Sequence, residues 1–279
     1  MEKITKELIQ KFELHLYEEE KSTNTVEKYL RDIRFFAKWL NERSLDKTAV
    51  LEYKKFLCEK YALSSVNSIL SSLNTFFSFF DHHTLKVKTL KIQKQIFADK
   101  DRELTKTEYE KLLVVAKKAK NYRLYCLMQT IGSTGIRISE LKFITCEAVK
   151  SGIAKINCKG KVRQILLSKH LCKMLKSYAK KMRIYSGSVF VSKSGSPLNR
   201  SNIWKMLKKL CEIAGVSRKK VFPHNFRHLF ARTFYSKQKD IVRLADILGH
   251  SSIETTRIYT MESGTEHIKL LQKLGLLRC

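Results

Sequence analysis

Apolar residues recur every three or four positions along the first 80 residues, which is the spacing of one helix face. The pattern consists of four runs, which start at Leu8, Val26, Val50 and Val66. Such runs predict four short amphipathic helices, and helices of this kind bury their apolar stripes by packing into a bundle. In the second run, Asn24 is the expected N-cap, with Glu27 completing a capping box.

This periodicity stops after residue 82. Residues 83–102 are rich in lysine and end in a cluster of charges, so the sequence predicts a basic, extended linker there. The four helices before the linker form a predicted N-terminal domain over residues 1–82. The chain after it forms a second domain over residues 103–279.

The second domain mixes two periodicities. Thr105 and Glu108 have the spacing of a capping box for a helix, and most of the chain beyond them is helical in pattern. Over 153–167, two short apolar stretches flank a Lys-Gly pair, which predicts two strands joined by a tight turn. Val189–Val191 is a candidate for a further strand. The predicted fold class is mainly α with a small β-sheet.

Charge narrows the class of partner. The chain carries 55 Lys and Arg against 26 Asp and Glu, a formal net charge of +29. A surface this basic repels itself unless a polyanion binds it, and nucleic acid is the commonest such partner. A peripheral membrane protein would need a basic amphipathic segment with exposed apolar residues, and none stands out. We therefore expect a nucleic-acid partner and no membrane.

Composition excludes several other classes. Hydrophobic residues make up 43% of the chain, and only 10 Gly and 2 Pro are present, so a packed core is expected. No apolar run reaches the roughly 20 residues that span a bilayer, and the first twenty residues are charged throughout. The seven cysteines form no CxxC pair and lack zinc spacing. We expect a cytoplasmic protein with reduced thiols, no metal and no cofactor.

Six polar residues interrupt the apolar pattern of the second domain and carry the candidate chemistry: Arg137, Lys159, His224, Arg227, His250 and Tyr259. Arginine forks bind phosphate oxygens, lysine can protonate a leaving alkoxide, histidine can accept a proton, and tyrosine can attack phosphorus. Taken singly, each is more often a surface or core residue. Together they suit phosphodiester transesterification, and no phosphate-binding loop for ATP accompanies them.

Four motifs hold these residues: TGIRISEL at 134–141, CKGKVRQILL at 158–167, HNFRHLFA at 224–231 and LGHSSIETTRIYT at 248–260. Their order and spacing resemble the tyrosine recombinases of the phage integrase family. The resemblance implies a mixed α/β catalytic domain, and the N-terminal helices resemble the family's helical, SAM-like core-binding domain. Because the helical pattern begins close to residue 1, the chain resembles the compact Xer-type recombinases.

The resemblance implies a phosphate-binding group. Arg137, Arg227 and His250 resemble the side chains that hold and neutralise the scissile phosphate. Glu140 resembles the acidic residue that orients the first of these arginines. We therefore expect these four residues to lie close together.

It also implies the groups that move protons and bonds. Tyr259 resembles the nucleophile that forms a 3′-phosphotyrosyl link, and His224 resembles the residue that assists its deprotonation. Lys159 resembles the hairpin lysine that protonates the leaving 5′ oxygen. The hairpin is one residue shorter than in many relatives, so Lys161 is a rival for that role.

The implied activity is site-specific recombination of double-stranded DNA by a synaptic tetramer. Chromosome resolution and mobile-element integration or excision both remain open, as does the need for a second recombinase or an accessory protein. A tail helix over 264–279 is expected to dock on a neighbouring subunit or on its own domain. Two alternatives are a type IB topoisomerase and a non-catalytic DNA-binding protein.

Overall fold

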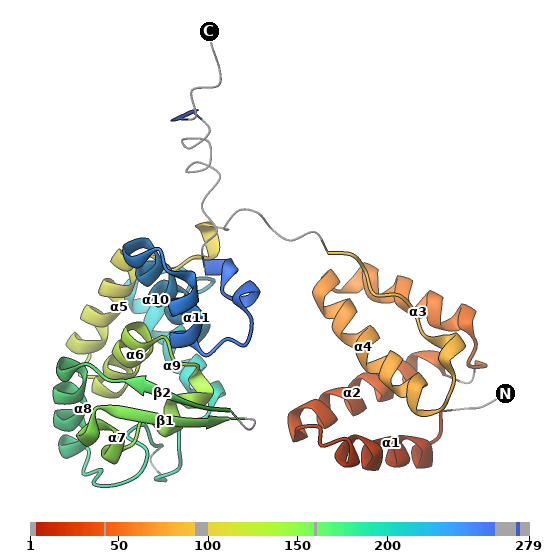
Figure 1. The fold of residues 1–279 in the computed structure, drawn as a ribbon, viewed down its shortest axis with the longest axis horizontal. Helices are drawn as coiled ribbons and strands as arrows, with labels where there is room; N and C mark the ends of the chain where they lie inside the picture. The colour runs from red at the N-terminus through yellow and green to blue at the C-terminus, as the bar shows by residue number, and fades with distance from the viewer. Residues whose placement is uncertain are drawn as a thin grey trace. The chain divides into compact units, whose positions relative to one another are not determined.

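The computed structural model describes residues 4–41, 43–92, 100–158, 161–192, 194–259 and 272–273. The chain divides into two compact units, Met1–Lys94 and Gln95–Cys279, and helices dominate both (Figure 1). The prediction of a mainly helical chain with a small β-sheet is confirmed. Within the described ranges, the helices are all too short or too polar to cross a bilayer.

The described residues of the first unit form four α-helices and a short 3-10 helix: α1 (Lys6–Glu18), α2 (Thr23–Leu40), α3 (Lys47–Lys60), α4 (Leu63–Phe79) and η1 (His83–Leu85). Their apolar stripes meet in one core that is rich in aromatic rings. Phe12 and Phe76 pack edge to face with ring centroids 5.0 Å apart, and Phe36 lies 4.8 Å from Tyr53. Such ring pairs contribute beyond the area that they bury.

The N-terminus of α2 lies two residues earlier than the sequence predicted. Ser22 is the N-cap, with extended backbone angles, and the helix begins at Thr23. Asn24, the predicted cap, is therefore already inside the first turn. The Ser22 hydroxyl pairs with Thr25 Oγ1 at 2.8 Å and makes no cap bond to the backbone.

The start of the predicted linker packs onto the first unit. Leu85 and Val87 are buried in its core. Two α4 asparagines bind the extended backbone at both its donor and its acceptor: Asn74 pairs with Val87, and Asn67 pairs with Leu90. Because a side-chain amide offers one donor and one acceptor group, it replaces the neighbouring strand that this segment lacks.

The second unit contains the remaining elements: η2 (Lys100–Arg102), α5 (Lys106–Lys118), α6 (Tyr122–Thr134), η3 (Ile138–Phe143), α7 (Cys146–Ser151), β1 (Ile153–Cys158), β2 (Lys161–Leu166), α8 (Lys169–Lys181), α9 (Arg200–Ala214), α10 (Pro223–Gln238), α11 (Ile241–Leu248), η4 (Ile253–Thr255) and η5 (Arg257–Tyr259). Helix α10 packs against α6 and α11 (Figure 1). The predicted capping box of α5 forms between Thr105 and Glu108.

β1 and β2 pair antiparallel, in a register that sets Ile153 opposite Leu166 and Cys158 opposite Lys161. Side chains alternate along β2, so Ile165 is buried while Leu166 is exposed. The further strand predicted at Val189–Val191 is absent from the described residues. In that segment a single isolated bridge forms, between Val191 and Pro197.

Gly135 ends α6 in a left-handed conformation that only glycine adopts without strain, with φ of 65°. A Cβ there would lie 2.8 Å from Cε1 of Phe230 and 3.0 Å from Cδ2 of Leu248. Gly215 ends α9 with a similar φ of 60°, and a Cβ there would have no neighbouring atom within 4 Å. We expect G215A to cost about 1 kcal/mol through backbone strain alone. G135A should cost about 1–3 kcal/mol more because it also overpacks the core.

Urea denaturation checks this difference. Trp204 lies in the second unit and Trp39 in the first, and the chain has 2 Trp. A W39F background therefore makes fluorescence report on the second unit alone. Equal losses of unfolding free energy in G135A and G215A would contradict the contact with Phe230 and Leu248.

Candidate active site

The C-terminal ends of two helices converge on the guanidinium of Arg227, a residue of α10 that is only 1% exposed. Its Nη1 donates to the carbonyl of Gly135, the C-cap of α6, at 2.6 Å, and its Nη2 donates to the carbonyl of Leu248, the last residue of α11, at 2.8 Å. Both carbonyls lack partners within their own helices and carry the negative end of the helix dipole. Burial and, next, the charge of Arg137 lower the pKa of Arg227 to about 10, so it stays a cation at neutral pH.

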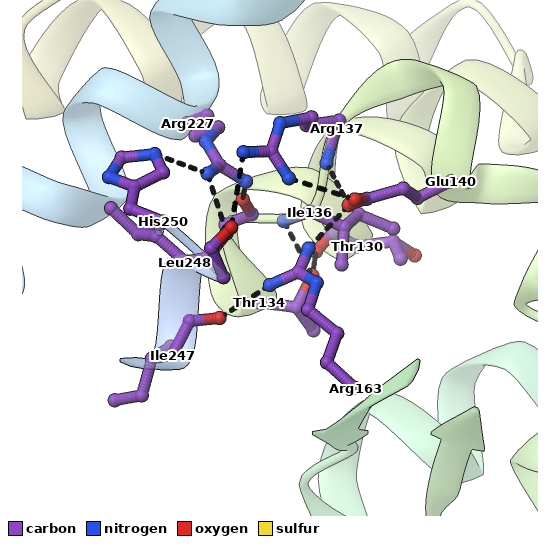
Figure 2. A network of polar contacts seen from close by, with 12 residues as sticks. Thr130, Thr134, Ile136, Arg137, Glu140, Arg163, Arg227, Ile247, Leu248 and His250 are labelled. Atoms are coloured by element: carbon purple, nitrogen blue, oxygen red, sulfur yellow. Dashed lines mark hydrogen bonds and ion pairs between the residues drawn. The ribbon is translucent and has the colours of Figure 1, made fainter. Parts of the chain in front are cut away.

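Arg137 follows the Gly135 turn and is held by Glu140. The two residues form a reciprocal pair in which the Arg137 backbone N–H donates to Glu140 Oε2 at 2.7 Å and its Nη1 donates to Oε1 at 3.0 Å. Glu140 is 3% exposed, whereas 41% of the Arg137 side chain is exposed. A buried carboxylate thus fixes a guanidinium that still faces solvent (Figure 2).

His250 completes this group beyond the left-handed turn at Gly249, where φ is 65°. Its Nε2 lies 2.9 Å from Arg227 Nη2, and its Nδ1 lies 2.8 Å from Thr256 Oγ1. Because arginine only donates hydrogen bonds, Nε2 is the acceptor and Nδ1 carries the proton toward Thr256. Burial, and then the charge of Arg227, lower the pKa of His250 to about 4, so the imidazole is neutral at pH 7.

Tyr259 lies in η5 and is 4% exposed. Its ring stacks on that of His250, with centroids 6.0 Å apart and planes 17° from parallel. Tyr259 belongs to a small buried cluster that includes Leu244 and Leu248 of α11. A cavity of about 500 Å³ opens beside it and is lined by residues that include Arg137, Arg227, His250 and Tyr259.

His224 occupies the first turn of α10 and lines the same cavity. Desolvation, followed by the charge of Arg227, lowers its pKa. The structure places His228 between this residue and the tyrosine: the His224 and His228 rings lie 4.6 Å apart, and the His228 and Tyr259 rings 4.8 Å apart. Sequence reasoning missed His228, although a residue four positions after His224 shares its helix face.

Arg163 is a second residue that sequence reasoning missed. Its Nη2 donates to Glu140 Oε2 at 2.5 Å, and its Nη1 donates to the carbonyl of Ile247 at 2.7 Å. Its position in the predicted strand could have identified Arg163 from the sequence. Arg163 alternates with exposed neighbours and so shares the face of β2 on which Ile165 and Leu167 are buried. A charged residue on a buried strand face needs a charged or polar partner.

The structure therefore brings together five of the six candidate side chains, along with Glu140. The sixth, Lys159, lies outside the described residues, as do the side chain of Lys161 and nearly all of the predicted tail helix over 264–279. Among the residues described, no three His, Cys, Asp or Glu side chains gather in a metal-binding cluster.

This arrangement has the chemistry of an anion site. Arg137 and Arg227 line the cavity, and the neutral rings of His228 and His250 lie beside the ring of Tyr259. Guanidinium groups bind phosphate oxygens and stabilise charge that develops on them. A tyrosine beside such a group is placed to act as a nucleophile.

Comparison with known proteins agrees with this chemistry. The model of the phage integrase family matches residues 102–266, and that of the SAM-like N-terminal domain of phage integrases matches residues 9–83. Tyrosine recombinase XerA of Pyrococcus furiosus is 28% identical over 97% of this chain and 95% of its own.

Two solved structures share the fold. XerH site-specific recombinase, bound to its difH substrate before cleavage, has a TM-score of 0.66 at 25% identity, covering 88% of this chain and 78% of that one. A lambda integrase tetramer bound to a Holliday junction has a TM-score of 0.72 at 18% identity, covering 91% of this chain and 76% of that one. The first family match alone spans more than half of the sequence. The resemblance drawn from the four motifs is thus confirmed, and the chain belongs to the phage integrase family as a tyrosine recombinase of the Xer type.

Proposed function

We propose that the cavity beside Tyr259 is the active site of a site-specific DNA recombinase, which cuts and rejoins DNA through a 3′-phosphotyrosyl intermediate. One observation carries this proposal. Arg137, Arg227 and His250 line a single cavity with the ring of Tyr259, although they come from four separate segments of the chain. Relatives named as recombinases favour this activity over that of a type IB topoisomerase.

The proposed step conserves atoms and charge. The Tyr259 oxygen attacks the scissile phosphorus, a P–O bond forms to the tyrosine, and the P–O5′ bond breaks. His224, through its neighbour His228, accepts the phenolic proton, and Lys159 donates a proton to the leaving 5′ oxygen. Because the new bond is a phosphodiester like the old one, the reverse attack by a 5′ hydroxyl rejoins DNA without ATP.

The phosphate would sit between the two arginines. Arg227 is fixed by two backbone carbonyls and His250, so it needs little rearrangement to meet an oxygen on phosphorus. Arg137 is more exposed and offers its guanidinium from the rim of the cavity. Such preorganised donors stabilise the charge of a pentacovalent transition state.

The wider assembly is part of the same proposal. The domain at 1–82, the linker at 83–102 and the catalytic domain at 103–279 would clamp a DNA duplex, and four subunits would hold two duplexes in a synaptic tetramer. DNA as substrate and reduced cysteines favour a cytoplasmic location. A second recombinase or accessory protein would be compatible with either chromosome resolution or mobile-element integration and excision. The tail helix at 264–279 remains a prediction.

Y259F tests the nucleophile. The variant keeps the ring, which stacks on His250 and packs against His228, and loses only the hydroxyl. Wild type should form a covalent adduct with a nicked suicide substrate in the presence of EDTA, and Y259F should bind the same DNA without forming one. An adduct from Y259F, or a wild-type adduct that requires magnesium, would contradict the proposal.

The leaving-group role of Lys159 has its own test. K159A should lose most cleavage of ordinary DNA, because the 5′ alkoxide must be protonated as it leaves. A substrate with sulfur at the bridging 5′ position should restore cleavage, since a thiolate leaves without a proton. K161A is the matched control. Rescue confined to K161A would assign the role to Lys161 instead.

The net charge of +29 predicts a strong salt dependence of DNA binding. Each phosphate contact releases condensed counterions, so about eight contacts should give a slope of about −7 for log K against log salt concentration. Fluorescence anisotropy with a labelled duplex measures this slope. A nearly flat response would argue against a clamp that encloses DNA.

A further inference from the structure

Arg163 is the least expected member of the polar network shown in Figure 2. It projects from the buried face of β2, and its side chain is 17% exposed. Its two terminal nitrogens reach different parts of the unit: Nη2 binds Glu140 at 2.5 Å, and Nη1 binds the Ile247 carbonyl at 2.7 Å. One side chain thus joins the β-hairpin, η3 and the end of α11.

Its partners are the supports of the proposed phosphate-binding group. Glu140 Oε2 accepts from both Arg163 and the Arg137 backbone, while Oε1 accepts from the Arg137 guanidinium. Ile247 lies in the last turn of α11, three residues before His250. Arg163 therefore holds the partner of Arg137 on one side and the segment that leads to His250 on the other.

A third contact lies at the turn between these parts. A Cβ on Gly249 would come within 2.5 Å of Arg163 Cδ and 2.8 Å of its Nε. The Arg163 stem thus packs directly against the backbone that immediately precedes His250. The carbonyl oxygen of Gly249 also lies 3.5 Å from Arg137 Nη2.

The hairpin does not need an arginine here for its own pairing. Its register is carried by six backbone pairs, and Ile165 and Leu167 bury the same strand face. Arg163 Nε is buried without a hydrogen-bond partner, which costs free energy that an apolar residue would avoid. The hydrogen bonds that its guanidinium does make reach outside the hairpin, to Glu140 and to α11.

We propose that Arg163 is a positioning residue of the recombination reaction. By binding Glu140 and the end of α11 together, it sets Arg137 and His250 at the spacing that one phosphate requires. This inference rests on the proposed function of the cavity. Arg163 touches no reacting atom in it and acts through Glu140 and the Gly249 backbone.

R163M is the main variant, and R218M is its matched control. Arg218 pairs with Glu212 on the surface, so R218M removes the same side chain and the same charge without touching a residue of the network. We expect both variants to bind DNA similarly. R163M should cleave a suicide substrate on the order of 10- to 100-fold more slowly than R218M, by analogy with residues that orient the ligands of metal sites.

Modified substrates separate positioning of the phosphate group from other roles. A methylphosphonate at the scissile position removes one phosphate charge, so the arginines have less charge to neutralise. The loss of cleavage rate in R163M relative to R218M should therefore be smaller on this substrate. A bridging 5′ sulfur removes the need for a general acid and should leave the deficit unchanged. An equal deficit on all three substrates, or rescue by sulfur alone, would overturn the proposal.

A double-mutant cycle tests the route through Glu140. If Arg163 acts through that carboxylate, R163M should slow cleavage much less in an E140Q background than in wild type. Fully additive losses would contradict the route. R163K keeps the charge but puts a single terminal nitrogen in place of the two with which Arg163 binds Glu140 and Ile247 separately. It should therefore show the same substrate pattern as R163M, and it decides the matter if R163M fails to fold. Absence of any adduct from wild type would instead refute the proposed function itself.

Discussion

The buried guanidinium of Arg227 is the constraint on which the rest of the catalytic unit depends. A cation that is 1% exposed is stable only if its charge and its donors are matched. The carbonyls at the ends of α6 and α11 provide this match. Two helices must therefore end at the same point in space, and α10 must run between them. The packing of α6, α10 and α11 therefore depends on the position of the Arg227 guanidinium.

The two left-handed glycines follow from the same constraint. A helix that presents its last carbonyls to a cation has to turn away sharply, and Gly135 and Gly249 make those turns. Within two positions of each turn lies a residue that lines the cavity, Arg137 after the first and His250 after the second. The chain thus uses the same helix end and glycine turn twice. In the sequence these turns are the Gly-containing motifs at 134–141 and 248–260.

The sequence predicted most of this because its signals are local. Helix periodicity located the four helices of the first unit, and motif spacing located the residues around the cavity. Its errors have physical causes. The N-cap of α2 was predicted at Asn24 but lies at Ser22. Both residue types suit an N-cap, and the extended backbone angles at Ser22 are what place the start of the helix there. The predicted linker overlapped the first unit because Asn67 and Asn74 bind its backbone across the fold, which no local pattern records.

Arg163 and His228 were missed for a different reason. Both are visible in the sequence, one as a charge on a buried strand face and the other at helical spacing from His224, but neither pattern is informative until its partner is known. Glu140 stands 23 residues from Arg163, and Tyr259 stands 31 residues from His228. Pairing at that range is set by the tertiary fold. The family resemblance therefore named the candidate residues that line the cavity, but not Arg163, which contacts Glu140 beside them.

The charge balance of the site points to the kind of anion it accepts. The described part of the network holds three guanidinium cations, those of Arg137, Arg163 and Arg227, against the carboxylate of Glu140. A second carboxylate that lines the cavity, Glu254, forms an ion pair with Arg257 at 3.9 Å, so these two charges offset each other. The two helix C-termini each contribute about half a negative charge. The histidines add nothing, because burial beside these arginines keeps them neutral. The balance leaves about one positive charge unmatched, on the side where Arg137 is exposed. A phosphodiester carries one negative charge, so DNA entering the cavity would complete a balance that the protein alone leaves open.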